Sequence, residues 1–155
     1  MVPVGGGGLL AGTVLWAAAA RPDVRVVGVE AEASRAVSAA VAAGRVVEVP
    51  VGPTLADGLA GNLEPGSITP ALAAGRVHAL VAVTETEIER AIRFLAAGGL
   101  VVEGAGAVGV AALLAGKVPL DGPVVVLLSG RNIAAATLAR ILAGHNDPRP
   151  PVGDA

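Results

Sequence analysis

The residues of this chain best suited to chemistry are four consecutive glycines, Gly5 to Gly8, in the stretch MVPVGGGGLLAG. Glycine has no Cβ atom and accepts positive φ angles, so consecutive glycines let several backbone N–H groups converge on one anion. A short apolar run precedes them and a helical pattern follows, and a helix N-terminus carries partial positive charge. Strand, glycine loop and helix in this order predict a phosphate site in preference to a flexible turn.

The spacing leaves the kind of phosphate open. A Walker loop requires Gly-Lys-Ser/Thr, and GGLLAG contains neither the lysine nor the hydroxyl. Gly6, Gly8 and Ala11 fit the dinucleotide pattern G-x-G-x-x-G/A. Glu30 follows about 20 residues later, at the end of the next expected strand, where an acid would bind a ribose. An NAD(P)-binding Rossmann oxidoreductase domain is therefore one hypothesis.

Three further polar positions follow apolar runs. Ser129 in VVVLLSGRN is expected to end a buried strand, with Asn132 able to cap the next helix. Ligands of open α/β sheets bind beyond the carboxyl ends of the strands, so Ser129 is expected to face the region of the glycine loop. Glu103 in LVVEGAGAVG is either a functional carboxylate at a strand end or an acid favoured by a helix dipole. Asp57 in TLADGLA is explained by a turn.

Amine and metal chemistry have few candidates. Lys117 is the one lysine among 11 basic residues, so it is the only side-chain primary amine. The absence of cysteine excludes disulfides and thiolate metal sites. His78, in an apolar stretch, and His145, near the end of the sequence, have no partners at metal-ligand spacing. No metal site is expected, and core packing or solvent exposure accounts for the histidines.

Composition indicates a core of small aliphatic side chains. Of 155 residues, 54% are hydrophobic, 15% are charged and 1% are aromatic, which suits helices on a buried parallel sheet. The net charge of -2 gives no basic surface for nucleic acid or an anionic membrane. The uncharged N-terminal stretch lacks the basic region of a signal peptide, and its proline and glycines interrupt any spanning helix. Neither nucleic acid nor membrane is expected as a partner.

Hydrophobic patterns predict strands alternating with helices. Strands are expected at residues 1–4, Arg25 to Glu30, 45–50, 77–83, 100–104 and 123–130. Helices are expected at Leu9 to Ala20, Glu32 to Gly44, 71–75, 84–99, 105–116 and 135–144, with a helical turn in the loop 54–70. Thr84 followed by Glu87 has the pattern of a capping box. The order predicts an α/β fold of three αβα layers, whose mostly parallel twisted sheet is covered on both faces.

Five blocks occur in one order: VPVGGGGLLAG, VVGVEAE, TLADGLA, LVVEGAGAVGVAALLAGKV and VVVLLSGRNIA. Together they resemble the C-terminal half of the threonine/serine dehydratases and serine racemases, in the β-family (fold type II, tryptophan synthase β-like) of pyridoxal-phosphate enzymes. The resemblance runs from Val2 to about Gly144. It implies a partial cofactor domain over residues 1–144, incomplete at its N-terminal side, and the polar residues 145–155 are expected to form a disordered tail.

The resemblance also implies roles for particular residues. The phosphate of pyridoxal 5'-phosphate would be bound by the backbone N–H groups of Gly5, Gly6, Gly7, Gly8 and Leu9. Ser129 would form a hydrogen bond to the pyridine nitrogen. The family's Schiff-base lysine belongs to a segment that precedes the glycine loop, and Lys117 lies at a non-catalytic position. No catalytic residue is therefore expected in this chain, which alone would be inactive.

The implied reaction is β-elimination of L-threonine or L-serine to a 2-oxo acid and ammonia, in a cytoplasmic enzyme with a small amino-acid substrate. A homo-oligomer is implied for the full-length enzyme. Arg131 departs from the second glycine of the family's S-G-G-N turn. Ala36 stands where serine racemases carry the second acid of a metal site that begins at the acid matching Glu30, so a racemase is disfavoured. A non-catalytic remnant with an exposed sheet edge is a third hypothesis.

Overall fold

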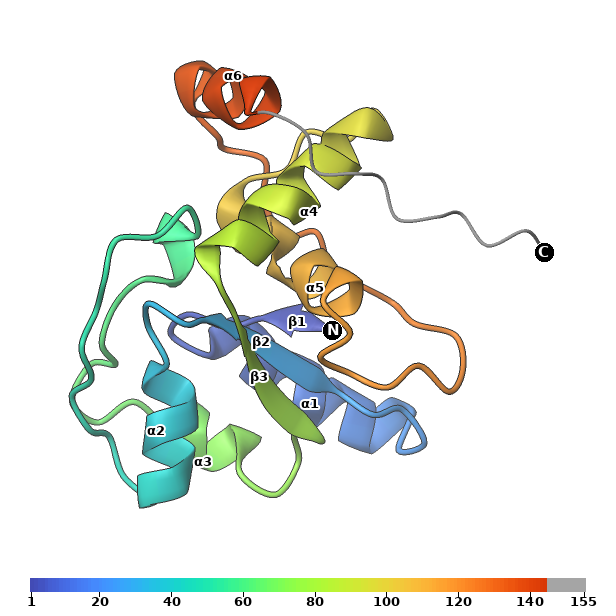
Figure 1. Cartoon of the computed structure of the whole chain (residues 1–155). Helices are drawn as coiled ribbons and strands as arrows, with labels where there is room; N and C mark the ends of the chain where they lie inside the picture. Colours follow the sequence, from blue (N-terminus) through green and yellow to red (C-terminus); the bar gives the residue numbers. More distant parts are fainter. Residues whose placement is uncertain (145–155) are drawn as a thin grey trace.

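A parallel sheet lies at the centre of the protein, in a computed structural model that describes residues 1–144 (Figure 1). Its strands are β1 (Val2–Pro3), β2 (Val27–Ala31) and β3 (Ala79–Val83), in the order β1-β2-β3. Val2 pairs with Gly28, and Val29 pairs with Val81, both in parallel register. The expectation of a parallel α/β sheet is confirmed. The tail expected at residues 145–155 lies outside the described residues.

Helices cover both faces of the sheet, as predicted (Figure 1). One face carries α1 (Gly8–Ala20), α2 (Ala36–Ala43) and α3 (Thr69–Ala73), and the other carries α4 (Glu85–Ala97), α5 (Gly104–Leu114) and, against α4, α6 (Ala135–Ala143). A short 3-10 helix, η1 (Asp57–Leu59), lies in the loop after α2. Two buried hydrophobic clusters result, one around Val4 and Leu10 and the other around Val29 and Val108. None of the helices in residues 1–144 is both long and apolar enough to cross a membrane.

Local signals explain several helix boundaries. The hydroxyl of Thr84 accepts a hydrogen bond from the Glu87 N–H (3.2 Å), and the Glu87 carboxylate accepts one from the Thr84 N–H (2.8 Å). The predicted capping box at the start of α4 is therefore confirmed. Gly44 ends α2 with a φ of 66°, a left-handed conformation that favours glycine.

Two predicted strands are wrong because their backbone groups find other partners. At residues 45–50, the Val49 N–H and C=O bond to the side-chain amide of Asn62 (2.8 and 3.0 Å), not to a neighbouring strand. At residues 100–104, the chain leads directly into α5, and Glu103 is the N-cap residue of that helix.

The segment 123–130 also differs from the fully buried strand that its composition predicts. The Met1 amino group donates to the Val125 carbonyl (2.7 Å) and the Leu127 N–H donates to the Met1 carbonyl (3.1 Å), a parallel pattern beside β1. No strand within residues 1–144 covers the other edge of the segment, and Val125 is 73% exposed. The next helix, α6, begins at Ala135 as predicted, but its N-cap residue is Ala134 and not Asn132.

Close contacts fix α5 against the loop at residue 55 and against the segment 123–130. A Cβ atom on Gly104 would lie 2.0 Å from the Leu55 carbonyl oxygen, and one on Gly109 would lie 2.6 Å from a methyl carbon of Val126. Gly104 therefore requires glycine for reasons of space, and a side chain at residue 109 would have to displace Val126. Gly12 in α1 has no atom within 4 Å of such a Cβ.

We expect Gly104→Ala to lower the free energy of unfolding by at least about 2 kcal/mol, because a backbone oxygen blocks the added methyl group. The matched control Gly12→Ala should raise it by about 0.5–1 kcal/mol, since alanine is the better helix former. Urea unfolding followed by circular dichroism measures both. Equal stability of the two variants would contradict the packing described for α5.

Candidate cofactor site

The glycine loop presents free backbone donors at the start of α1. Within residues 1–144, no group accepts a hydrogen bond from the N–H groups of Gly5 to Leu9. Gly7 is the N-cap residue of α1, with a φ of 81°, and has no side chain to occupy the first-turn donors. Their arrangement suits an anion, because the helix dipole adds positive potential at the same point.

Packing accounts for two of the four glycines. A Cβ on Gly5 would lie 3.0 Å from the Cα of Leu59, and a Cβ on Gly7 would lie 2.8 Å from the Thr69 hydroxyl oxygen. Gly6 and Gly8 have nothing within 4 Å of a Cβ and are exposed. No protein contact requires glycine at those two positions, and the open space beside them can admit a ligand.

Thr69 holds the loop from the side of α3. Its hydroxyl donates a hydrogen bond to the Gly6 carbonyl oxygen (2.7 Å). This bond occupies the carbonyl oxygen of Gly6 and leaves the N–H groups of the loop free. This role of Thr69 could not be predicted from the sequence. The only available signal was Pro70 near a helix start, which marks the position of α3 but not its contact with a loop 63 residues earlier.

The other motifs converge behind the glycine loop. Gly58 lies between the glycine loop and α5. Its carbonyl oxygen is 3.1 Å from the Cβ position of Gly5, and a Cβ on Gly58 itself would lie 3.3 Å from the Ala105 side chain. The Cβ position of Gly106 lies 2.8 Å from the Gly130 carbonyl oxygen. The structure therefore brings the loop at residue 58, the start of α5 and the turn after Ser129 to one corner of the sheet.

Ser129 lies at this corner, and its side chain is exposed. The side chain of Arg131, two residues later, is exposed too. Nothing in the described part of the chain forms a hydrogen bond with the Ser129 hydroxyl. The bonds of Met1 to Val125 and Leu127 set a parallel register, and continuing that register sets Ser129 level with Val4, just before the glycine loop. The hydroxyl is therefore free to bind a ligand.

Glu30 does not face this open region. Its side chain is 1% exposed and accepts hydrogen bonds from the Val37 N–H (2.9 Å), the Ser38 N–H (3.2 Å) and the Ser38 hydroxyl. The carboxylate thus satisfies donors at the start of α2. It is already engaged and does not reach a ribose, which removes the main support for a dinucleotide site.

The remaining candidates have structural settings. The Lys117 Nζ lies 3.1 Å from a Glu87 carboxylate oxygen and 4.0 Å from one of Glu32, so two acids hold the only side-chain amine. Asp57 accepts a hydrogen bond from the next N–H, as expected for a turn. His78 is exposed and does not pack in the core. His145 lies outside the described residues.

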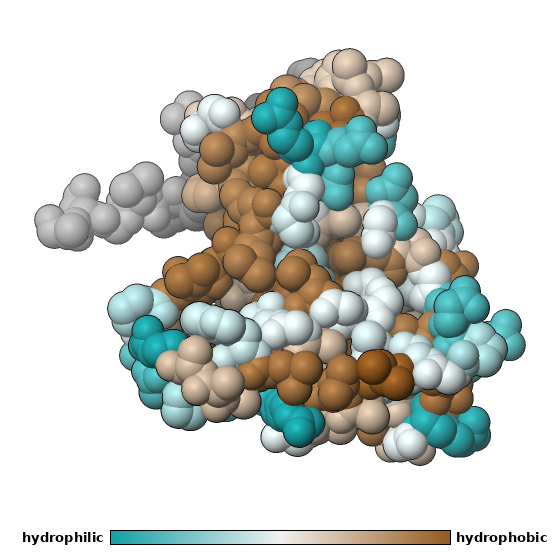
Figure 2. Space-filling model, turned by 180° about the vertical axis from the view of Figure 1, so that it is seen from behind, coloured by the Kyte–Doolittle hydropathy of each residue, from teal (hydrophilic) through white to brown (hydrophobic). Residues whose placement is uncertain are grey.

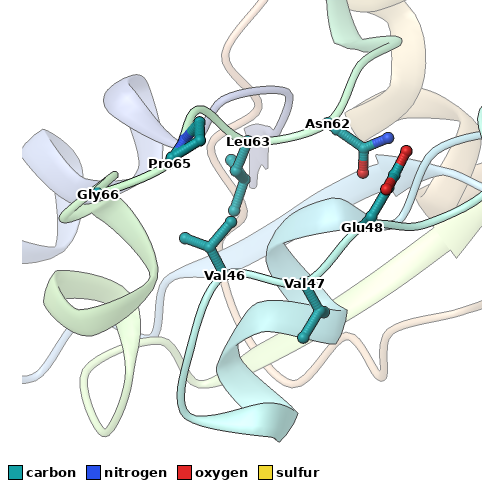
Figure 3. Close-up of a pocket in the computed structure, with 7 residues that line it drawn as sticks. All are labelled: Val46, Val47, Glu48, Asn62, Leu63, Pro65 and Gly66. Carbon is teal, nitrogen blue, oxygen red and sulfur yellow. The ribbon is translucent and has the colours of Figure 1, made fainter.

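A separate surface hollow of about 520 Å³ lies between the segment after α2 and the loop before α3 (Figure 3). It is lined by Val46, Val47, Glu48, Asn62, Leu63, Pro65 and Gly66. The Asn62 amide forms one hydrogen bond through its oxygen and one through its nitrogen to the Val49 backbone, and both Asn62 and Glu48 are exposed. None of the lining residues therefore aims a buried polar group into the hollow. None of the residues predicted from the sequence lines it.

Fold and site together define an α/β protein with a parallel sheet and, at a strand-to-helix turn, a glycine loop with free backbone donors. The chain belongs to the pyridoxal-phosphate dependent enzyme family, whose model matches residues 1–130. It is 44% identical over 144 residues to the L-threonine ammonia-lyase of Thermotoga maritima, a match that covers 92% of this chain and 35% of that protein. The expected family is confirmed.

Solved structures agree with this assignment. A threonine deaminase from T.th. matches with a TM-score of 0.78 and 36% identity, over 86% of this chain and 48% of that one. Maize serine racemase matches with a TM-score of 0.79 and 30% identity, over 90% of this chain and 44% of that one. The chain spans 35% to 44% of the length of the curated relatives it matches.

We expect Glu30→Ala to lower the free energy of unfolding by about 2 kcal/mol, because three donors at the start of α2 lose their acceptor. Glu48→Ala, which removes an exposed carboxylate, should change it by less than about 0.5 kcal/mol. Chemical denaturation measures both. A stable Glu30→Ala variant with weakened binding of NAD would restore the dinucleotide hypothesis.

Proposed function

We propose that this chain supplies the phosphate cradle and the pyridine contact of a pyridoxal-phosphate-dependent threonine/serine dehydratase (ammonia-lyase). The observation that carries the proposal is the glycine loop, with N–H groups that have no acceptor within residues 1–144 and with Gly6 and Gly8 open to ligand. Membership of the family and the identity to an L-threonine ammonia-lyase support the substrate class.

In this proposal the phosphate accepts hydrogen bonds from the N–H groups of Gly5 to Leu9. A phosphate dianion suits this place because the first turn of α1 offers donors and a favourable dipole and the loop has no acidic side chain. Thr69 keeps the Gly6 carbonyl oxygen engaged, so an acceptor is not turned toward the anion.

Ser129 is proposed to form a hydrogen bond to the pyridine nitrogen. Its hydroxyl is uncharged, so it does not favour a protonated ring in the way a carboxylate would. When bound, pyridoxal phosphate supplies an electron sink for charge that develops at the α-carbon of the amino acid. The contribution of this chain is to hold and orient the two ends of the cofactor.

The lysine that would carry the cofactor is proposed to lie outside these 155 residues, because Lys117, which follows α5, is held by the carboxylates of Glu87 and Glu32. Exposed apolar side chains support a larger assembly around this chain: Val124, Val125 and Leu128 beside β1, and Leu15 and Trp16 on α1. Extensive apolar surface is also seen from the back of the molecule (Figure 2). A homo-oligomer and a cytoplasmic location stay predictions.

We expect Gly6→Ala and Gly8→Ala each to weaken binding of 4′-deoxypyridoxine 5′-phosphate at least tenfold, because a methyl group takes space beside the phosphate donors. This probe lacks the aldehyde, so it cannot react with an amine. Isothermal titration calorimetry measures the affinity. Both variants should unfold at the urea concentration of the wild type or above it, since no protein atom lies within 4 Å of either Cβ.

Gly12→Ala is the matched control for this experiment, because it adds the same methyl group to the same helix away from the loop. Its affinity for the probe should equal that of the wild type. The phosphate site is refuted if the two loop variants bind as well as this control, or if the wild type binds NAD but not the probe.

The chain alone, mixed with pyridoxal phosphate and L-threonine, should form no more 2-oxobutanoate than pyridoxal phosphate without protein. A chimera can be made from two pieces: the part of the Thermotoga maritima protein that comes before its matched region, followed by residues 1–144 of this chain. We expect this chimera to deaminate threonine. An assay of 2-oxobutanoate with lactate dehydrogenase measures both. The proposed function fails if the chimera folds and binds pyridoxal phosphate yet is inactive beside an active parent enzyme.

A further inference from the structure

Glu103 has an unusual position for a carboxylate. It is the N-cap residue of α5, yet its side chain makes no hydrogen bond to its own helix. Its carboxylate instead accepts a hydrogen bond from the Asn132 N–H (2.7 Å), and its own N–H donates to the Gly130 carbonyl oxygen (3.2 Å). Glu103 therefore joins α5 to both sides of the turn that follows Ser129.

The same carboxylate explains the glycine after Ser129. A Cβ on Gly130 would lie 2.1 Å from one carboxylate oxygen of Glu103 and 2.9 Å from the other. The φ of Gly130 is not in the left-handed region, so backbone conformation does not require glycine here. A methyl group at this position would instead have to displace the Glu103 carboxylate.

The turn is also held from behind by the first turn of α5. The Cβ position of Gly106 lies 2.8 Å from the carbonyl oxygen and 3.1 Å from the nitrogen of Gly130. The carboxylate of Glu103 lies 4.0 Å from the Cβ position of Gly58, the residue that packs behind Gly5. One carboxylate thus lies between the serine turn and the support of the glycine loop.

We propose that Glu103 is a positioning residue, which sets the distance and direction of the Ser129 hydroxyl relative to the glycine loop. This inference rests on the proposed function, because it assigns the hydroxyl to the ring of a phosphate-bearing pyridine. The charge of Glu103 is not required, because one oxygen acceptor of the right length satisfies the Asn132 N–H. The phosphate donors do not depend on Glu103, because α1 and Thr69 hold them.

The test uses the full chain and two probes. Glycerol 3-phosphate carries a phosphate monoester without a ring and reports on the glycine loop alone. The second probe, 4′-deoxypyridoxine 5′-phosphate, adds the pyridine ring, and its absorption band reports the protonation of the ring nitrogen. Calorimetry and difference absorption are recorded for the wild type, Glu103→Ala, Glu103→Gln, Gly130→Ala and Ser129→Ala, with Glu48→Ala as a remote control.

We expect Glu103→Ala and Ser129→Ala each to weaken the ring probe about tenfold and to shift its absorption band in the same direction. Binding of glycerol 3-phosphate should change less than twofold. Glu103→Gln should stay within about threefold of the wild type for both probes, since the amide oxygen replaces the acceptor. The double variant Glu103→Ala/Ser129→Ala should bind the ring probe no more weakly than either single variant, because the two residues act through one contact.

Other results would overturn the inference. Equal losses for both probes in Glu103→Ala would mean a general structural role, and an unchanged ring-probe affinity would mean that Ser129 needs no such support. If Glu103→Ala does not fold, Gly130→Ala decides, because its methyl group displaces the carboxylate and should weaken only the ring probe. A wild type that binds neither probe would refute the proposed function itself, whereas binding of both with no effect of Glu103 refutes this inference alone.

Discussion

The close approach of backbones at the start of α5 is the constraint on which the site depends. Gly104 lies directly against the carbonyl oxygen of Leu55, and Gly106 lies against the backbone of Gly130. Without side chains at these two positions, one helix turn can contact both the loop behind the glycine cradle and the turn that carries Ser129. A site built from backbone donors needs such support, because peptide groups, unlike side chains, cannot adjust by changing rotamers.

Local signals allowed much of the fold to be predicted from the sequence. The capping box at Thr84 and the glycine at residue 44 act within one or two turns of helix, so their outcome needs no knowledge of distant residues. The apolar runs at 100–104 and 123–130 have the composition of buried strands. Whether such a run becomes a strand depends on a neighbour with free backbone groups, and hydrophobic pattern carries no information about that neighbour.

For the site, the glycine loop and Ser129 could be proposed from residue type and order, and the structure brings both to one corner of the sheet. The sequence left two roles open for Glu103. The structure places it at the N-terminus of α5, as one of them expects, and adds a hydrogen bond that its carboxylate accepts from the distant Asn132 N–H. For Thr69, Pro70 indicates a helix start but not the contact with the glycine loop. That contact joins residues 63 positions apart, and no spacing rule predicts such a pairing.

The contact of Met1 with Val125 affects how the chain folds during its synthesis. The two residues are 124 positions apart, so β1 has no partner on that side until the segment around Val125 has left the ribosome. At about 5–20 residues per second, synthesis of that stretch takes on the order of ten seconds, and nonlocal strand pairing is slow in itself. During that interval the edge of β1 that will meet Val125 is open, and a chaperone could bind there.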